Sequence, residues 1–251
     1  MKIDYPVEDQ LPQLRRLWQE AFGDDAAFLD LFFHNVFTPD RCRCVTVAGT
    51  VAAALYWLDC RCQDRPIAYL YAVATGKKHR GQGLCRALMA DTHRLLAELG
   101  YAGTVLVPGE LPLFEMYGSM GYRPCSTIRE FAREAGPERA ALRVLSPEEF
   151  AAKRRQYLPA GAVLQEGENL TFLAGLAKFY EGPDFLLCAA DGPEGLKGLE
   201  LLGNTDSAPA ILTALGKASG TFRTPGPGSE FAMYRPISDA LMPAYFGFAF
   251  D

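Results

Sequence analysis

The chain has 251 residues, with 25 Lys and Arg against 30 Asp and Glu and a formal net charge of −5. Hydrophobic residues make up 49% of it, which excludes disordered, collagen-like and coiled-coil architectures. The acidic balance argues against a nucleic-acid partner, and no apolar run reaches the roughly 18 residues that a membrane span needs. The N-terminal sequence MKIDYPVEDQ lacks the apolar core of a signal peptide, so a cytoplasmic protein is expected.

The first 125 residues mix helical and extended patterns. Apolar side chains recur at helical spacing in several segments, and apolar runs between them indicate strands. The predicted elements, in chain order, are helices at 6–23 and 25–36, hairpin strands at 41–48 and 51–58 around Gly49-Thr50, a strand at 66–75, a helix at 84–100, a strand at 103–108 and a short helix with a turn at 111–122. This order predicts a mixed α/β layer.

The composition changes after about residue 136, where the sequence reads GPERA. We place a domain boundary there, between a first domain at 1–135 and a smaller one at 136–251. The similar order of elements predicts that both halves are α/β. The second half is expected to contain helices at 146–157, 167–180 and 207–215 and strands at 184–190, 196–202, 229–236 and 245–250.

The segment most informative about function is 71–86, YAVATGKKHRGQGLCR, where a buried strand leads through two glycines into a helix. A helix N-terminus offers unpaired backbone N–H groups and about half a positive charge. Glycines let the backbone approach a phosphate closely, and Arg80 adds further donors. The segment therefore predicts an anion site, although a plain strand-to-helix turn also needs glycines. It matches neither the Walker loop nor the Rossmann fingerprint.

The run Arg80-Gly81-Gln82-Gly83-Leu84-Cys85 resembles the coenzyme A pyrophosphate loop of the GCN5-related N-acetyltransferase (GNAT) superfamily, Arg/Gln-x-x-Gly-x-Gly/Ala. Cys85 stands where that family usually has Gly or Ala. A second element, Tyr117-Gly118-Ser119-Met120-Gly121-Tyr122, resembles the Tyr-x-x-x-Gly-aromatic element that follows in the family. The resemblance covers about residues 1–125 and implies the mixed-sheet GNAT acyl-CoA N-acyltransferase fold.

The resemblance also implies an activity, with acetyl-CoA as co-substrate and a primary amine as acceptor. Backbone groups of Val73, Ala74 and Thr75 would pair with the pantetheine arm, and Tyr117 would protonate the departing thiolate as general acid. No metal is implied. The residues that would wrap the pyrophosphate are Arg80, Gly81, Gln82, Gly83, Leu84, Cys85 and Arg86.

A general base is useful because only about 0.04% of a lysine-type amine is neutral at pH 7. Glu110 and Glu115, which flank the same region, are two candidates. The second half resembles a degenerate GNAT repeat, as in tandem acetyltransferases such as the aminoglycoside-acetylating enhanced-intracellular-survival group. In that group a terminal carboxylate serves as the base, which makes Asp251 a third candidate here. This chain is much shorter than members of that group.

Several other clusters have both a functional and a structural interpretation. Cys42-x-Cys44 and Cys60-x-Cys62 could bind zinc, but pairs separated by one residue are unusual for zinc, and seven Cys exclude a complete disulfide framework. Free thiols are therefore favoured. The helix N-terminus at Cys85 is expected to lower the pKa of its thiol, which would make it reactive, but packing under the coenzyme is the favoured interpretation. The aromatic residues at 28–37 predict a core that could also border an acceptor site. The segment 223–228 matches R-x-x-G-x-G, but its prolines remove donors and a strand follows it.

Two other classes of protein stay compatible with the sequence. One is a tandem GNAT-fold aminoacyltransferase that uses aminoacyl-tRNA, against which the acidic balance and the complete phosphate loop both argue. The other is a non-catalytic acyl-CoA-binding protein. The expected partner is a small-molecule or peptide amine, with no nucleic acid and no membrane. The sequence predicts neither the identity of the acceptor nor the oligomeric state.

Overall fold

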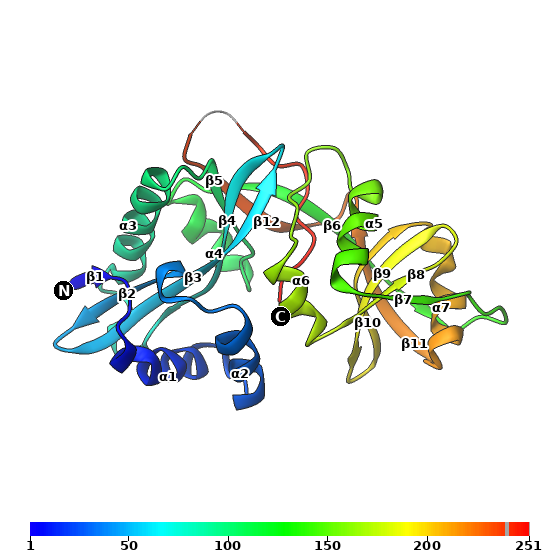
Figure 1. Cartoon of the computed structure of the whole chain (residues 1–251), viewed down its shortest axis with the longest axis horizontal. Coiled ribbons are helices and arrows are strands. Elements are labelled where there is room, and N and C mark those ends of the chain that lie inside the picture. The colour runs from blue at the N-terminus through cyan, green and yellow to red at the C-terminus, as the bar shows by residue number, and fades with distance from the viewer. Residues whose placement is uncertain (239–240, 251) are drawn as a thin grey trace.

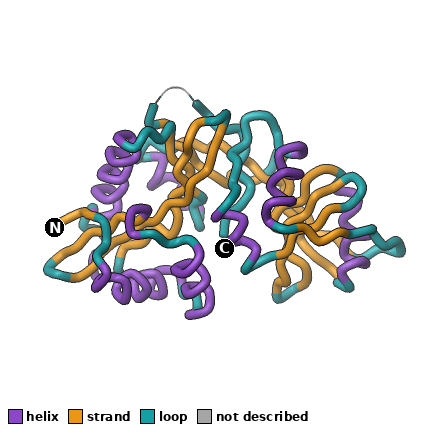
Figure 2. Tube along the Cα trace, in the orientation of Figure 1, coloured by secondary structure: helices purple, strands orange, loops and turns teal. Residues whose placement is uncertain are grey.

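The computed structural model describes residues 1–238 and 241–250. Within them, twelve strands form one mixed sheet, which helices flank (Figures 1 and 2). The strands are β1 (Lys2–Asp4), β2 (Cys42–Val47), β3 (Thr50–Cys62), β4 (Arg65–Thr75), β5 (Gly103–Leu106), β6 (Arg123–Glu134), β7 (Arg143–Leu145), β8 (Lys178–Glu181), β9 (Phe185–Gly192), β10 (Gly195–Gly203), β11 (Ser219–Pro225) and β12 (Ser229–Pro236). The helices are α1 (Leu11–Phe22), α2 (Ala26–Asn35), α3 (Leu84–Glu98), α4 (Leu111–Gly118), α5 (Pro147–Tyr157), α6 (Glu168–Ala174) and α7 (Ala208–Leu215).

The strand order reads similarly from either end of the sheet, β1-β2-β3-β4-β5-β12-β6-β11-β10-β9-β8-β7. The first half has a parallel pair, β4 with β5, and the second half has a corresponding parallel pair, β10 with β11. The sixth strand of each half is exchanged. β12 pairs with β5, β6 pairs with β11, and β6 and β12 pair with each other at the centre. The predicted mixed α/β architecture of both halves is confirmed.

The exchange of β6 and β12 makes it difficult to divide the chain into two domains at residue 136. Residues 135 and 136 follow directly after β6, which ends at Glu134. A division there would assign β12 to the second domain, although its neighbours in the sheet are β5 and β6. The two domains at 1–135 and 136–251 therefore stay a prediction, and any such division cuts through a continuous sheet.

Successive side chains of β3 point to opposite faces of the sheet, and each face packs against a helix. Tyr56 packs in the same core as Trp18 of α1, whereas Trp57, one residue later, packs in a second core with Leu88 of α3. This is the two-residue period of a strand buried on both faces. The predicted helix stop is confirmed at Gly23, which closes α1 with a φ of +80° that favours glycine.

The C-terminal segment 245–250 differs from prediction. It was expected to be a strand, but it is extended chain that passes between the two halves (Figure 1), with one isolated bridge between Ala162 and Tyr245. Instead of a neighbouring strand, two side chains form hydrogen bonds with the backbone of this segment. Ser126 Oγ donates to the Phe246 carbonyl at 3.0 Å and accepts from its N–H at 3.1 Å. The Gln165 amide makes the same two bonds with Phe248 at 2.9 and 3.0 Å.

A buried ion pair in the second half meets this segment. The Arg154 guanidinium donates to both oxygens of Glu200, at 2.6 and 2.8 Å, and the Tyr245 hydroxyl donates to Glu200 at 2.9 Å. A Cβ at Gly247 would lie 2.0 Å from Glu200 Oε1, so glycine lets the chain pass close to the pair. Glu200 lies on β10 just beyond the residues that pair with β11. In the second half, side chains and the C-terminal segment thus occupy the space where β10 separates from β11.

Two further predictions were incomplete. The helix expected at 167–180 ends at Ala174, because the chain turns at Gly175 and continues as β8. β6 and β11 were not predicted as strands, although each is long enough to pair with two neighbours.

Candidate active site

The site begins where β4 and β5 separate. The two strands pair only from Ile67 to Tyr69 on β4, although β4 continues to Thr75. β4 also carries a bulge, because between Tyr71 and Ala74 it spans one more residue than β3 does. Ala72 lies in this bulge with a φ of +48°, a conformation that costs a non-glycine residue about 1–2 kcal/mol. The bulge turns backbone groups of β4 away from the ladder and toward the gap that β5 leaves.

The predicted phosphate loop follows β4. Gly81 and Gly83 have φ values of +73° and +75°, and a Cβ at either position would meet no atom within 4 Å. Glycine is therefore required by the backbone conformation, not by crowding. Arg80 folds back so that Nε donates to the Thr75 carbonyl at 3.2 Å. The first amide of α3 with a backbone partner is Ala87, which donates to Gly83, so the preceding amides at the helix start are open to a ligand.

A groove of about 550 Å³ joins this loop to the end of β4. Gln82 and Arg86 do not line it. The Gln82 amide donates to the Lys78 carbonyl at 3.2 Å, and Arg86 donates to the Ser119 carbonyl at 3.2 Å and hydroxyl at 2.8 Å. Arg86 thereby connects α3 to α4. Predicted cofactor residues that do line the groove are Val73, Ala74, Thr75, Arg80, Gly81, Gly83, Leu84 and Cys85.

The expected lowering of the Cys85 thiol pKa is wrong. Burial raises the pKa of this thiol, and the nearby Arg86 charge lowers it by less. The side chain packs with the α3 core, so desolvation outweighs the helix N-terminus.

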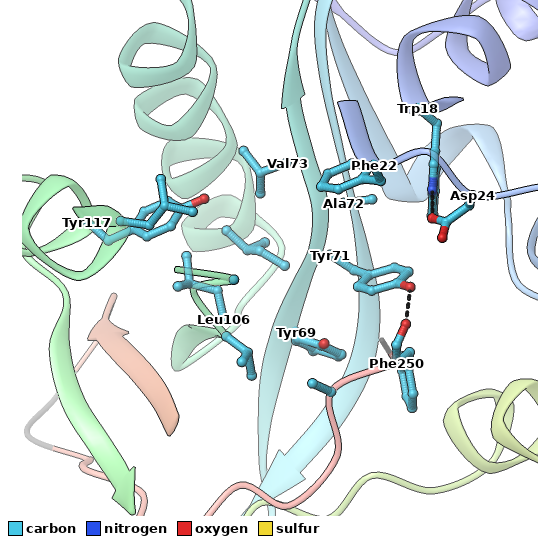
Figure 3. A pocket seen from close by; sticks show the side chains of 15 residues that line it. Trp18, Phe22, Asp24, Tyr69, Tyr71, Ala72, Val73, Leu106, Tyr117 and Phe250 are labelled. Carbon is cyan, nitrogen blue, oxygen red and sulfur yellow. Dashed lines mark hydrogen bonds between the residues drawn. The ribbon is translucent and has the colours of Figure 1, made fainter. Parts of the chain in front are cut away.

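A second cavity, of about 370 Å³, lies on the other side of the β4 bulge (Figure 3). Its walls are apolar, with six aromatic residues among the fifteen that line it, and the segment 249–250 closes one side of this aromatic cavity. Val73 and Tyr117 line both cavities, so the groove and the aromatic cavity meet between these two residues. The residues shared by the two cavities are Phe22, Val73, Gly109, Leu113 and Tyr117.

Tyr117 of α4 therefore lies at the junction that its predicted role requires. Its side chain is 6% exposed, and its ring packs edge-on against Tyr122 with centroids 5.7 Å apart. Burial raises the pKa of the Tyr117 phenol above its usual value, so the hydroxyl stays protonated at neutral pH. The hydroxyl has no hydrogen-bond partner within residues 1–238 and 241–250, which leaves it free to donate to a ligand.

A buried polar network supports Tyr122 from behind. His93 Nε2 lies 2.8 Å from the Tyr122 hydroxyl and 3.1 Å from Thr104 Oγ1, and the two hydroxyls are 2.7 Å apart. Arg235 of β12 donates to His93 Nδ1, so Nε2 carries the ring proton. Burial and the Arg235 charge lower the pKa of His93 to about 3. The network fixes α3, β5 and β12 around the junction, and the sequence analysis did not identify it.

The candidate bases are placed differently from one another. Glu110 is exposed and lines the groove. Glu115 is exposed and does not line it, and its backbone carbonyl accepts the Ser119 N–H at the end of α4. Asp251 lies outside the described residues. Asp24, which sequence reasoning missed, supplies the one carboxylate among the described residues that line the aromatic cavity. It follows Gly23 at a helix end, where a carboxylate is usually solvated, so no sequence signal marked it.

The remaining candidates have structural roles. Cys42, Cys44, Cys60 and Cys62 are buried free thiols whose pKa values are raised by burial. No group of three metal-ligating side chains occurs in the described part of the chain. The aromatic residues of α2 pack against Trp18 and Tyr56 as core. Segment 223–228 is the end of β11 and a turn, with no helix after it.

Known proteins resemble this chain in sequence and in fold. Residues 2–125 match the family model described as an acetyltransferase (GNAT) domain. The N-acetyltransferase Eis of Mycobacterium tuberculosis is 40% identical over 65 residues, which are 26% of this chain and 15% of that protein. The match thus spans a small part of the curated relative. No helix in the described residues has the length and apolarity to cross a membrane.

Solved structures resemble nearly the whole chain. A GCN5-related N-acetyltransferase from Anabaena variabilis has a TM-score of 0.75 at 15% identity, covering 94% of this chain and 73% of that one. One from Kribbella flavida gives 0.72 at 17% identity, with 94% and 70% covered. Eis1 from Mycobacterium abscessus gives 0.68 at 14% identity, with 94% and 74% covered. These likenesses show that the chain has the GNAT fold. The chain belongs to the GNAT superfamily of acetyltransferases.

Proposed function

We propose that this protein transfers the acetyl group of acetyl-CoA to a primary amine by direct attack in a ternary complex. The observation that carries the proposal is the meeting of two cavities between Val73 and Tyr117. One leads from a helix N-terminus and a glycine loop, which suit a pyrophosphate. The other is a separate aromatic chamber in which an acceptor can reach the thioester carbonyl.

Different residues of the groove would bind different parts of acetyl-CoA. Open amides at the start of α3 and the Arg80 side chain would bind the pyrophosphate. Backbone groups of β4 from Val73 to Thr75 would bind the pantetheine arm as an added strand, since β5 does not pair with them. Gln82 contributes its backbone, because its side chain is bonded to Lys78. We assign Arg86 a supporting part, holding α4 through Ser119.

The reaction balances without any further reactant. The neutral amine nitrogen attacks the thioester carbonyl carbon, a C–N bond forms, and the C–S bond breaks. Tyr117 donates its proton to the departing sulfur, and the proton lost by the amine passes through solvent and restores the phenol. The products are an N-acetylated amine and free coenzyme A. A phenol kept protonated by burial suits this role, because the proton is present when the thiolate forms.

The acceptor and the cellular setting are also proposals. A small-molecule or peptide amine fits a chamber of about 370 Å³, at the low end for small-molecule sites. A cytoplasmic location is in keeping with seven free cysteines.

The first test is the melting temperature with and without acetyl-CoA. At about 100 times its dissociation constant the ligand adds roughly 2.7 kcal/mol, which raises the melting temperature by about 5–10 °C. Arg80→Glu should abolish the increase, and Arg139→Glu, at an exposed arginine far along the chain, should keep it. No increase at millimolar acetyl-CoA would overturn the proposal.

Release of free thiol from acetyl-CoA in the presence of amines then tests catalysis. Binding without thiol release across a broad panel of amines would favour the non-catalytic acyl-CoA-binding class. Binding of charged tRNA in place of acetyl-CoA would favour the aminoacyltransferase class.

A further inference from the structure

We propose that the acceptor is a compact diamine, with one amine held as a cation by Asp24 while the other is acetylated beside Tyr117. This inference rests on the proposed function and names the substrate class of the same site. Three features of the aromatic cavity carry it: the composition of its walls, the state of the Asp24 carboxylate, and the positions of Asp24 and Tyr117.

The cavity walls favour an organic cation with an apolar body. Six of the fifteen lining residues are aromatic and seven are aliphatic. Ring faces attract ammonium groups, while ring edges and aliphatic side chains contact hydrocarbon. The volume of about 370 Å³ suits a compact ligand better than a branched polycation. The aromatic residues are Trp18, Phe22, Tyr69, Tyr71, Tyr117 and Phe250.

The Asp24 carboxylate accepts a hydrogen bond from a neutral donor. Trp18 Nε1 donates to Asp24 Oδ2 at 2.7 Å, which fixes the carboxylate on the cavity wall. Among the described residues, no Lys, Arg or His forms an ion pair with it. A half-buried carboxylate against aromatic rings loses part of its hydration, so a ligand cation there gains more than it would in water.

The position of Asp24 separates this cation from the reacting nitrogen. Figure 3 shows Asp24 and Tyr117 on opposite sides of the cavity, with Tyr71 and Ala72 between them. The amine that attacks the thioester must lie near the β4 bulge and Tyr117. A positive group bound at Asp24 therefore belongs to a second nitrogen of the same molecule, joined to the first by an apolar linker that contacts the rings.

Two matched amines, one with and one without a second nitrogen, test whether Asp24 binds that second nitrogen. The probes are 4-methylbenzylamine and 1,4-bis(aminomethyl)benzene, which share one rigid aromatic body and differ by the second amine. Binding to the full chain is measured by calorimetry with coenzyme A present and absent, and acetyl transfer is measured separately by thiol release. We expect the diamine to bind at least about 10-fold more tightly, a factor that corresponds to about 1.4 kcal/mol. The KM values should differ in the same sense.

Asp24→Asn should reduce the preference for the diamine to nearly one while binding of the monoamine stays within about two-fold. Asp64→Asn is the control, because Asp64 is fully exposed in the β3–β4 turn at a φ of +61° that Asn tolerates. Equal binding of the two probes by the wild type, or equal loss of both in Asp24→Asn, would overturn the inference. Selective diamine binding without acetyl transfer would support it and count against the proposed function. Acetyl transfer to monoamines without a preference for the diamine would support the proposed function and overturn this inference.

Discussion

The Tyr71 hydroxyl donates a 2.7 Å hydrogen bond to the backbone carbonyl of Phe250, 179 residues further along the chain (Figure 3). Tyr71 directly precedes the β4 bulge, and Phe250 closes one side of the aromatic cavity. The bond therefore joins the strand expected to hold the donor to a segment that shapes the acceptor chamber. The C-terminal segment thus forms part of the wall of the candidate site.

Removing the Tyr117 hydroxyl tests the general acid. We expect Tyr117→Phe to lower kcat about 100-fold, the lower range for a lost acid catalyst, with an unchanged KM for acetyl-CoA. Stability should change little, because the hydroxyl has no partner within the described part of the chain. Steady-state kinetics with thiol detection measures the effect. An unchanged kcat would remove Tyr117 from the chemistry.

Two glycines at opposite ends of α3 allow a matched test of the loop. Gly83 and Gly100 have φ values of +75° and +83°, and a Cβ at either would meet nothing within 4 Å. Each substitution by Ala should cost about 1–2 kcal/mol of unfolding free energy from backbone strain. We expect only Gly83→Ala to weaken acetyl-CoA binding, as measured by calorimetry. Equal affinity in both variants would mean that no phosphate approaches Gly83.

The depressed pKa of His93 predicts a loss of stability in acid. With a pKa of about 3 in the folded state and about 6.5 when unfolded, His93 binds a proton only in the unfolded chain between these values. Stability is therefore fully present above pH 6.5 and is lost as the pH falls toward 3. His93 alone should lower the unfolding free energy by about 2 kcal/mol between pH 7.5 and pH 5.

Urea unfolding of the wild type and of His93→Gln at both pH values isolates this contribution. The variant is expected to be less stable at pH 7.5, because Arg235 and Tyr122 lose a partner, but to depend less on pH. Parallel pH profiles for the two proteins would contradict the assignment of a neutral His93.

The buried pair of Arg154 and Glu200 predicts a strongly non-additive pair of mutations. Glu200→Gln leaves a guanidinium that is 2% exposed without a counter-charge, which should cost about 3–5 kcal/mol. Arg154→Met combined with Glu200→Gln removes both charges and should recover much of that loss. Urea unfolding measures both variants. A double mutant no more stable than Glu200→Gln alone would show that the pair is not held together by charge.

The parts of this molecule that sequence could predict are those with a local chemical cause. The loop at 80–86 was predictable because Gly81 and Gly83 are needed for a left-handed backbone before a helix. α3 was predictable because its apolar residues follow a helical period and Gly100 stops it. Tyr117 was found through a motif; the structure buries it at the junction of two cavities, and its catalytic role stays a prediction.

The missed features depend on contacts between distant segments. The bulge at Ala72 carries no glycine that would mark it, because tertiary pairing with β3 imposes the strained φ. The exchange of β6 and β12 leaves each strand with an ordinary pattern, since side-chain alternation does not say which neighbour a strand takes. Asp24 is held locally by Trp18, but it faces a cavity only because β4 and the C-terminal segment supply the other walls.

Because β6 and β12 are exchanged, the sheet of the first half can be completed only late in synthesis. During synthesis β5 emerges early, but the strand that covers its edge, β12, follows only after almost the whole second half has been made. At about 5–20 residues per second, that edge waits on the order of ten seconds with unpaired amides and carbonyls. A nascent chain in that interval is a natural client for chaperones. We expect the completed protein to unfold as one unit, because separating the two halves breaks the pairing of β12 with β5 and of β6 with β11.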